Sequence, residues 1–260
     1  MTGPTGSSPP FSLDGLLAVV TGARRGIGLA IAEALARSGA DVVGVSVSLE
    51  REGGEARRRV TAAGRRYWEM PANLGDRDAV RRLLGRLEEI KRPVDILVNN
   101  AGTIHRAPAA EHAIDAWDDV LEVNLTAPFI LAQAIGAGMA ARGSGKIIFI
   151  ASLLTFQGGI NVVAYAASKH AIAGVTKAFA NEWAQAGVNV NAVAPGYIET
   201  DNTRPLREDP DRAHAILERI PAGRWGRPED IAGAVVFLAS SAADYVNGTV
   251  LAVDGGWLGR

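Results

Sequence analysis

The sequence predicts an α/β fold, in which helices cover both faces of a doubly wound, mostly parallel sheet of about seven strands within one domain. Three observations predict it. Short apolar runs alternate with helical patterns along the whole chain, a glycine-rich turn follows the first apolar run, and no linker divides the sequence. A chain of 260 residues has a length that α/β folds reach as one unit.

The first half of the chain alternates strands with helices. The run at 16–21 is almost wholly apolar, which is typical of a strand that is covered on both faces. The segment GARRGIG follows it, and then a helical pattern that ends at Gly39, so these elements and the strand at 41–47 form a right-handed βαβ unit. The other elements expected in this half are a helix at 50–63, a strand at 65–70, a helix at 76–91 and a strand at 94–98.

The second half continues the alternation and adds one insertion. The segment 203–219 is polar and interrupted by proline, so we expect a helical lid over a cleft, within an insertion at about 200–222. Residues 1–12 are rich in Gly, Pro and Ser and are expected to form a mobile tail, which leaves 13–260 as the folded domain. The other expected elements are helices at 114–142, 162–185 and 228–239 and strands at 146–151, 188–194 and 249–253.

Composition excludes several classes of function. The chain has 27 Lys and Arg against 28 Asp and Glu, so neither nucleic acid nor an acidic membrane is expected as a partner. The absence of cysteine excludes a disulfide framework and a thiolate nucleophile, and four scattered histidines predict no metal site. We also expect no signal peptide and no apolar run long enough to span a bilayer. The prediction is a soluble protein of the cytoplasm.

A glycine-rich segment, Thr21–Gly28, lies between the first strand and the first helix. In this position the N–H groups of a helix N-terminus bind a pyrophosphate. Gly22 permits the tight turn, Gly26 lets a phosphate approach the backbone, and Gly28 lets the helix pack closely. The spacing differs from G-x-G-x-x-G, and glycines also occur in ordinary turns between strands and helices. The strand before it and the helix after it favour the binding interpretation.

Two groups of asparagines are further candidates. The segment Asn99-Asn100-Ala101-Gly102 ends the strand at 94–98, at the edge where a doubly wound sheet places its ligand crevice. The alternative is an ordinary Asn/Gly turn. Asn124 lies in an apolar helical stretch, and because Asn is a poor helix former, a buried Asn there should form hydrogen bonds. Its alternative role is to cap a backbone kink near Pro128.

Ser152, Tyr165 and Lys169 form the candidate catalytic group. Ser152 follows the strand at 146–151, and Tyr165 and Lys169 share one face of the next helix, one turn apart. An unperturbed Tyr has a pKa of about 10, which is too high for a base at neutral pH. A neighbouring ammonium and a cationic nicotinamide would both favour the phenolate and lower that pKa. The group is therefore expected to transfer a proton.

These motifs together resemble the classical short-chain dehydrogenase/reductase family, whose members have a Rossmann-like fold. The resemblance runs from about Leu13 to Arg260, and the motifs occur in the family's order. They are TGxxxGxG at 21–28, NNAG at 99–102, the helical Asn124, Ser152, YxxxK at 165–169 and NAVAPG at 191–196. The resemblance implies an NAD(P)-dependent oxidoreductase that acts on CH–OH groups.

The resemblance also implies a role for each matching residue. Tyr165 would donate and accept the proton, and Ser152 would hydrogen-bond the substrate oxygen. Lys169 would hold the nicotinamide ribose and lower the pKa of the tyrosine, while Asn124 would anchor a water of a proton relay. The residues expected to line the cofactor are Gly22, Arg24, Arg25, Gly26, Ile27, Gly28, Ser46, Asn73, Leu74, Asn99, Ala101, Gly102, Tyr165, Lys169, Pro195, Gly196, Ile198 and Thr200.

The choice between NAD and NADP depends on the end of the second strand. A carboxylate there would accept the ribose 2′-OH and repel a 2′-phosphate, but this chain has Ser46. Arg24 and Arg25 lie at a helix N-terminus, where positive charge is disfavoured unless an anion is bound, so they are able to meet a 2′-phosphate. The resemblance favours NAD, and the local chemistry leaves NADP open.

Further segments resemble one branch of the family, which acts on deoxy sugar acids. They are FQGG at 156–159, NEWA at 181–184, APGY at 194–197, IPAGRWG at 220–226, DYVNG at 244–248 and VDGGW at 253–257. The resemblance implies reversible conversion of a secondary alcohol and a ketone on 2-dehydro-3-deoxy-D-gluconate. Arg106 is the first candidate to clamp the substrate carboxylate. Gln157 and Tyr197 would meet hydroxyls beside Ser152 and Tyr165.

Two alternatives and one expectation about assembly complete the hypothesis. The same residues would also serve another polyol, gluconate or a 3-oxoacyl substrate. An alternative of another class is a protein that senses nicotinamide without catalysis, but such a protein would not need both Tyr165 and Lys169. The family resemblance implies a homotetramer, in which the helices that carry Asn124 and Tyr165 pair across interfaces.

Overall fold

A computed structural model describes residues 9–48 and 54–260 of the chain. Its centre is one parallel sheet of seven strands in the order β3-β2-β1-β4-β5-β6-β7. The strand order reverses direction between β1 and β4, which is the switch point of a doubly wound sheet. The predicted fold class is therefore confirmed. The strands are β1 (Leu17–Thr21), β2 (Asp41–Ser46), β3 (Tyr67–Pro71), β4 (Ile96–Asn99), β5 (Gly145–Ile150), β6 (Val188–Pro195) and β7 (Val250–Val253).

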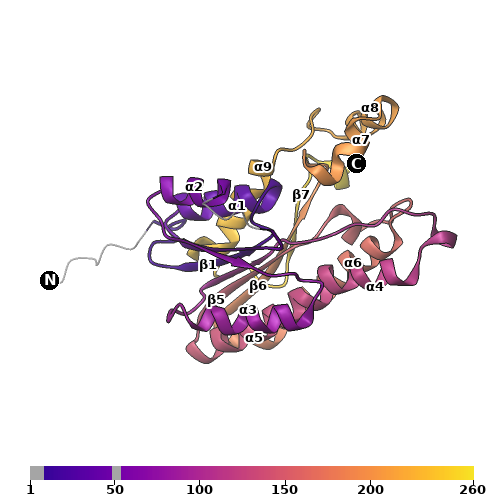
Figure 1. Ribbon diagram of the computed structural model, residues 1–260. Coiled ribbons are helices and arrows are strands. Elements are labelled where there is room, and N and C mark those ends of the chain that lie inside the picture. Colours follow the sequence, from indigo (N-terminus) through magenta and orange to yellow (C-terminus); the bar gives the residue numbers. More distant parts are fainter. Residues whose placement is uncertain (1–8, 49–53) are drawn as a thin grey trace.

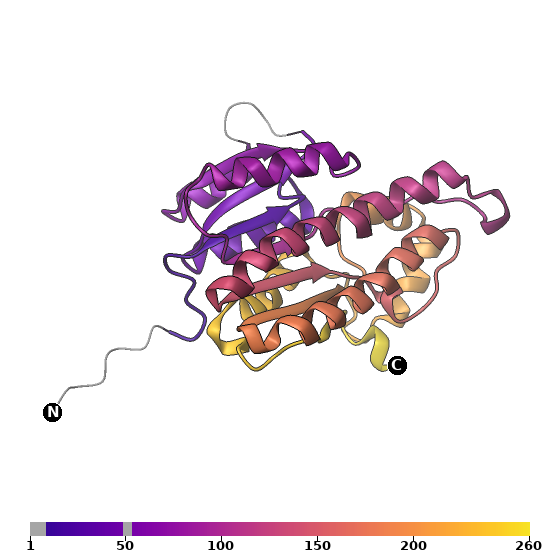
Figure 2. The ribbon, with the colours of Figure 1, turned by 90° about the horizontal axis from the view of Figure 1, so that it is seen from below.

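Successive residues of each central strand enter two different cores because side chains alternate across a sheet. Ala18 and Val20 of β1 pack towards α1 (Gly26–Arg37), α2 (Glu55–Ala62) and α9 (Pro228–Ala239). Leu17 and Val19 face the other layer, which contains α3 (Arg77–Glu88), α5 (Ala127–Arg142) and α6 (Val163–Trp183). Figures 1 and 2 show these layers on opposite faces of the sheet. Since both faces are covered, β1 and β4 are buried at every position.

One long helical region differs from the regular helix that we expected at 114–142. It consists of α4 (Ile114–Leu121), a π-helical segment, Glu122–Thr126, and α5. This region of 29 residues is long and apolar enough to cross a bilayer by length and composition only, and no other helix among the described residues meets that criterion. The expectation that no apolar run has this length is therefore wrong. Core helices meet the same criterion, and here Leu131 and Met139 are fully buried against the sheet.

The expected lid is helical, and the expected tail is only partly described. The segment after β6 forms a short 3-10 helix, Asp201–Thr203, then α7 (Arg204–Arg207) and α8 (Pro210–Arg219), which project beyond the sheet at one end (Figure 1). Residues 9–12 form a turn, and the carbonyl of Pro10 accepts a hydrogen bond from the backbone N–H of Ala242. Residues 1–8, and the start of the helix expected at 50–63, lie outside the described residues.

Candidate active site

The carboxyl ends of β1, β4, β5 and β6 meet at one edge of the sheet, and the predicted site residues follow these strands. In the glycine turn after β1, the tight turn predicted at Gly22 and the close helix packing predicted at Gly28 are both present. Gly22 has a φ of +70°, and a Cβ on Gly28 would lie 2.2 Å from the carbonyl oxygen of Gly22. Helix α1 therefore packs against the turn at a distance that only glycine allows. Gly26 starts α1 with a φ of +55°.

The turn after β4 is fastened to the glycine turn. The hydroxyl of Thr21 accepts hydrogen bonds from the backbone N–H groups of Asn100 and Ala101, both at 3.0 Å. The side-chain amide of Asn100 donates to the carbonyl of Thr21 at 2.9 Å. Asn99 is buried, and neither its Oδ1 nor its Nδ2 has a hydrogen-bond partner among the described residues. Buried polar groups are normally paired, so this amide is available for a ligand.

The side chain of Ser152 lies close enough to the phenol of Tyr165 for hydrogen bonding to affect its pKa. Ser152 follows β5, where it caps the 3-10 helix Leu153–Thr155, and Tyr165 lies in the first turn of α6. Burial raises the pKa of Tyr165, and the bond from Ser152 and the positive charge of Arg106 only partly offset this. In the chain alone the net direction is therefore opposite to the lowering that we expected, because burial outweighs the other effects.

Lys169 is buried, with 4% of its surface exposed, one turn beyond Tyr165. Its Nζ donates to the backbone carbonyl of Ile150 at 2.7 Å and lies 5.5 Å from the centre of the Tyr165 ring. Burial lowers the pKa of Lys169 to about 8. The lysine is thus still mostly protonated at neutral pH, and it lies beside the phenol.

Asn124 lies in the π-helical segment and is 2% exposed. Its Oδ1 accepts a hydrogen bond from the N–H of Thr103 at 2.8 Å, and its Nδ2 donates to the carbonyl of Thr103 at 2.9 Å. The same Nδ2 donates to the hydroxyl of Ser168 at 3.1 Å. The prediction that a buried Asn here forms hydrogen bonds is confirmed. Its side chain joins the segment after β4 to helix α6.

The residues predicted for the adenosine end of a cofactor lie at the ends of β2 and β3. The hydroxyl of Ser46 is buried and has no hydrogen-bond partner among the described residues. Arg24 donates to the hydroxyl of Ser48 at 2.5 Å, so its guanidinium lies beside the end of β2. Asn73 is exposed, and its Oδ1 caps the N–H of Gly75 at 3.0 Å. Leu74 follows it and is buried in the core, with 5% of its surface exposed.

The segment after β6 reaches back to the glycine turn. Pro195 is buried at the end of β6, and Ile198 is 4% exposed. The methyl group of Thr200 is the nearest group to a Cβ that would be added at Gly26, at 3.5 Å. Arg25 forms an ion pair of 2.8 Å with Asp201 at the start of the lid. The predicted nicotinamide side and the predicted phosphate side of the site are therefore adjacent.

A nicotinamide dinucleotide fits this set of residues. The N-terminus of α1 offers backbone N–H groups for a pyrophosphate, with no acidic residue in the first turn. The unpaired polar atoms of Asn99 and Ser46 lie at the ends of β4 and β2, which is where such a ligand crosses a doubly wound sheet. Within the described residues, no group of three or more acidic, His or Cys side chains is arranged for a metal ion.

Of the predicted substrate residues, Arg106 and Gln157 lie near the catalytic group, whereas Tyr197 lies among aromatic rings. Arg106 is exposed, its charge acts on Tyr165, and its Nη2 donates to the carbonyl of Asn202 in the lid at 3.1 Å. Gln157 lies just beyond the 3-10 helix that Ser152 caps, and Trp257 is its hydrogen-bond partner. The ring of Tyr197 instead packs against two tryptophan rings, which are described below, so its contact with substrate stays a prediction.

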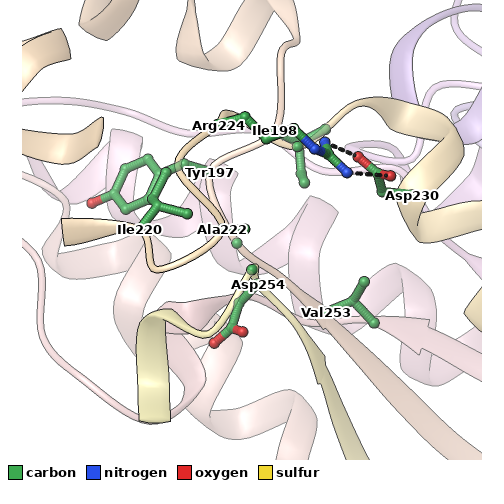
Figure 3. A pocket seen from close by; sticks show the side chains of 11 residues that line it. Tyr197, Ile198, Ile220, Ala222, Arg224, Asp230, Val253 and Asp254 are labelled. Carbon is green, nitrogen blue, oxygen red and sulfur yellow. Dashed lines mark hydrogen bonds and ion pairs between the residues drawn. The ribbon is translucent and has the colours of Figure 1, made fainter. Parts of the chain in front are cut away.

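A cavity of about 240 Å³ lies between the ends of β6 and β7 and the loop that follows the lid (Figure 3). Gly196 and Ile198, both predicted for the cofactor, contribute to its wall. Arg224 and Asp230 form an ion pair of 2.6 Å on one side of it, and that arginine lowers the pKa of Asp230 to about 2. The cavity adjoins the segment predicted to lie beside the nicotinamide.

Sequence reasoning missed residues that hold the catalytic group in place. The hydroxyl of Thr155 accepts from the N–H of Ser152 at 3.3 Å and donates to the carbonyl of Lys169 at 3.0 Å. Ser168 accepts from Asn124 and donates to the carbonyl of Tyr165 at 2.7 Å. Both are common residues at unremarkable positions, so only the folded arrangement identifies their role.

The chain belongs to the short-chain dehydrogenase/reductase family. Residues 22–258 match a family model that is described as enoyl-(acyl carrier protein) reductase. The chain is 59% identical over 250 residues to 2-dehydro-3-deoxy-D-gluconate 5-dehydrogenase of Pseudoalteromonas atlantica, which covers 96% of this chain and 98% of that protein. It is 54% identical to the Bacillus subtilis protein of the same name, over 96% of this chain and 97% of that protein.

A solved structure from Beutenbergia cavernae is similar throughout, with a TM-score of 0.93 and 52% identity over 97% of this chain and 100% of that chain. That protein is a proposed NAD(P)-dependent gluconate 5-dehydrogenase and contains bound NADP at low occupancy. Family membership and the retained Ser152, Tyr165 and Lys169 identify the chain as an oxidoreductase of CH–OH groups rather than a protein that only senses nicotinamide.

Proposed function

We propose that this chain interconverts a secondary alcohol and a ketone on a deoxy sugar acid, with 2-dehydro-3-deoxy-D-gluconate as substrate and carbon 5 as the reacting position. One observation carries the proposal. The neighbouring side chains of Ser152 and Tyr165 lie beside the buried ammonium of Lys169, at the sheet edge that also carries the glycine turn. The names of the two relatives support the choice of substrate.

The chemistry follows from the positions of these three side chains. A nicotinamide dinucleotide, when bound, supplies or accepts the hydride. In reduction, the Tyr165 hydroxyl donates its proton to the carbonyl oxygen, while Ser152 donates a hydrogen bond to the same oxygen. In oxidation, Tyr165 accepts the proton of the alcohol. The positive charge of Lys169, whose Nζ lies 5.5 Å from the centre of the tyrosine ring, stabilises the phenolate that reduction leaves behind.

The local chemistry at the end of β2 supports NADP as well as NAD. Ser46 replaces the carboxylate that would repel a 2′-phosphate, and Arg24 places a positive charge next to it. The NADP in the Beutenbergia cavernae structure supports the same assignment. We therefore assign NADP to this site ahead of NAD, with Asn99 and Lys169 at the nicotinamide ribose.

The lid and Arg106 are assigned to substrate binding. An arginine binds a carboxylate through two parallel hydrogen bonds, and Arg106 is the one whose charge reaches Tyr165. Its present bond is to the lid segment at Asn202, so substrate binding and lid position are linked through this side chain. We assign residues 200–222 as the lid that covers the substrate.

We assign a homotetramer in the cytoplasm. Helices α5 and α6 share a ladder of aromatic rings that runs outward from the core, in which Phe129 stacks on Phe179 at 5.7 Å and Phe179 on Trp183 at 4.4 Å. Phe129 is 37% exposed, as expected for a ring at the edge of an interface. Light scattering on the purified protein measures the subunit number, and a monomer would contradict the assignment.

Absorbance of the reduced nicotinamide, followed across a panel of substrates, tests the proposal. Its formation is measured with NAD⁺ and with NADP⁺ for the alcohols, and its consumption with NADH and with NADPH for the ketone. The panel includes 2-dehydro-3-deoxy-D-gluconate, gluconate, a neutral polyol and a 3-oxoacyl ester. We expect turnover to be fastest with the deoxy sugar acid. Tyr165→Phe should abolish turnover with cofactor affinity nearly unchanged, because the hydroxyl alone carries the proton. Preference for the polyol or the ester would contradict the substrate, and full activity of Y165F would contradict the mechanism.

A further inference from the structure

The C-terminal segment returns to the substrate side of the molecule. Trp257 is 4% exposed and begins a short 3-10 helix, Trp257–Gly259. The carboxylate of Asp254 accepts hydrogen bonds from the backbone N–H groups of Gly256 and Leu258, both at 2.9 Å. The backbone is thus fixed on both sides of Trp257, and the direction of its side chain is set.

The indole ring of Trp257 is also held by its neighbours. It packs in a small apolar cluster with Leu153, Ile216 and Ile220, which come from the segment after Ser152 and from the lid. The ring of Tyr197 lies 4.7 Å from it, and the guanidinium of Arg219 lies 4.2 Å above it. Contacts on several sides leave the ring little rotational freedom, so the position of its N–H is well defined.

That N–H points to Gln157. The distance between Nε1 of Trp257 and Oε1 of Gln157 is 3.3 Å. An indole N–H is only a donor, so the atom that faces it must be the amide oxygen and not the amide nitrogen. The NH₂ group of Gln157 is therefore the end of the amide that is left for another partner, and it can only donate.

We infer that Trp257 is a positioning residue, which orients the amide of Gln157 so that its NH₂ donates a hydrogen bond to an oxygen of the substrate. The inference rests on the proposed function, because it takes Gln157 as a substrate contact. Without Trp257 the amide is free to rotate by half a turn and present its oxygen instead. With Trp257 present, the site favours a substrate that places a hydrogen-bond acceptor next to the NH₂ group of Gln157. A carboxylate or a ketone oxygen is such an acceptor, and an ammonium group is not.

The first test is steady-state kinetics of Trp257→Phe in the direction of oxidation, at saturating NADP⁺ and with 2-dehydro-3-deoxy-D-gluconate as the varied substrate. Phenylalanine keeps an aromatic ring in the cluster and removes the N–H. We expect KM to rise about tenfold, which is about 1.4 kcal/mol, while kcat and the NADPH dissociation constant change by less than about twofold. Trp225→Phe is the matched control, since Trp225 also packs against Tyr197, at 5.6 Å between ring centres, and the KM of this variant should stay at the wild-type value.

A double-mutant cycle separates positioning from packing. If Trp257 acts through Gln157, then W257F should change KM little when Q157A is already present. Gln157→Glu keeps the size and shape of the side chain, so packing is unchanged. The carboxylate still accepts a hydrogen bond from the indole N–H of Trp257, but it has a negatively charged oxygen in place of the NH₂ group. We expect Q157E to raise KM for the acid substrate by more than W257F does.

Three results decide between the inference and the function on which it rests. Additive effects of W257F and Q157A would overturn the inference, because Trp257 would then act through the lid alone. An unchanged KM in Q157E would overturn it independently, even where W257F is too unstable to measure. If the wild-type enzyme does not turn over any of the sugar acids, the proposed function fails instead, and that outcome is visible before any variant is made.

Discussion

Lys169→Met tests the effect of the buried ammonium on stability. Lys169 is 4% exposed, and burial lowers its pKa from 10.5 to about 8. Each tenfold change in a protonation equilibrium corresponds to about 1.4 kcal/mol, so holding this lysine protonated costs about 3 kcal/mol of folding free energy below pH 8. Methionine has a similar length and carries no charge. The substitution removes this cost, although it also removes the hydrogen bond to the carbonyl of Ile150.

The sign of the pH dependence follows from proton binding. Between pH 8 and 10.5 the unfolded chain still holds the proton of Lys169, and the folded chain has released it. The free energy of unfolding therefore receives an increasing contribution from this residue as pH rises through that window. Below pH 8 both states are protonated, so the contribution is constant. In K169M the contribution is absent at every pH.

Urea unfolding at a series of pH values measures the difference. We expect the stability of the wild-type protein relative to K169M to increase by about 3 kcal/mol from pH 8 to 10.5. Lys177→Met is the matched control, because Lys177 lies on the same helix at an exposed position, and its profile should follow the wild type. Parallel profiles for the wild type and K169M across this window would refute the reasoning.

Three further substitutions, with Gly85→Ala as a control, test the close contacts and the cofactor assignment. Gly28→Ala would place a Cβ 2.2 Å from the Gly22 carbonyl oxygen. Thermal melts should show a free energy of unfolding lower by about 1–3 kcal/mol, and cofactor binding should weaken. A Cβ added at Gly85 would have no atom within 4 Å, so Gly85→Ala should raise the free energy of unfolding by up to about 1 kcal/mol in the same melts. Gly136→Ala would lie 2.3 Å from the ring of Trp183 and should destabilise by about 1–3 kcal/mol without changing KM. Ser46→Asp should weaken NADPH at least about tenfold and strengthen NADH, as fluorescence titration measures; unchanged affinities would contradict the proposed 2′-phosphate contact.

Most of the fold could be predicted because parallel strands that are covered on both faces form nearly continuous apolar runs in the sequence. The run at 16–21 and strand β1 differ at only one end, since Leu16 lies before the strand. The π-helical segment at Glu122–Thr126 could not be predicted in the same way. Its sequence fits an α-helix. In the structure, Asn124 of this segment forms hydrogen bonds with Thr103 and Ser168, which are distant in the chain and cannot be identified as its partners from the local sequence.

The catalytic group was predictable in composition but not in its electrostatics. Helical spacing alone brings Tyr165 and Lys169 onto one face, and the end of β5 brings Ser152 to them. The sequence does not show how deeply they are buried. Burial raises the pKa of Tyr165 and lowers that of Lys169, so the chain alone disfavours the charged form of both groups. Both shifts result from the helices and loops packed around the site.

The relative position of the serine and the tyrosine depends on a residue that takes no part in the chemistry. The hydroxyl of Thr155 accepts a hydrogen bond from the backbone N–H of Ser152 and donates one to the backbone carbonyl of Lys169. One buried hydroxyl therefore joins the segment that carries the serine to the helix turn that carries the tyrosine and the lysine. Ser168 fixes the same turn from its other side by linking it to Asn124. Proton transfer depends on heavy-atom distances within a few tenths of an ångström, so Thr155 and Ser168 belong to the requirements of the site as much as the three residues they hold.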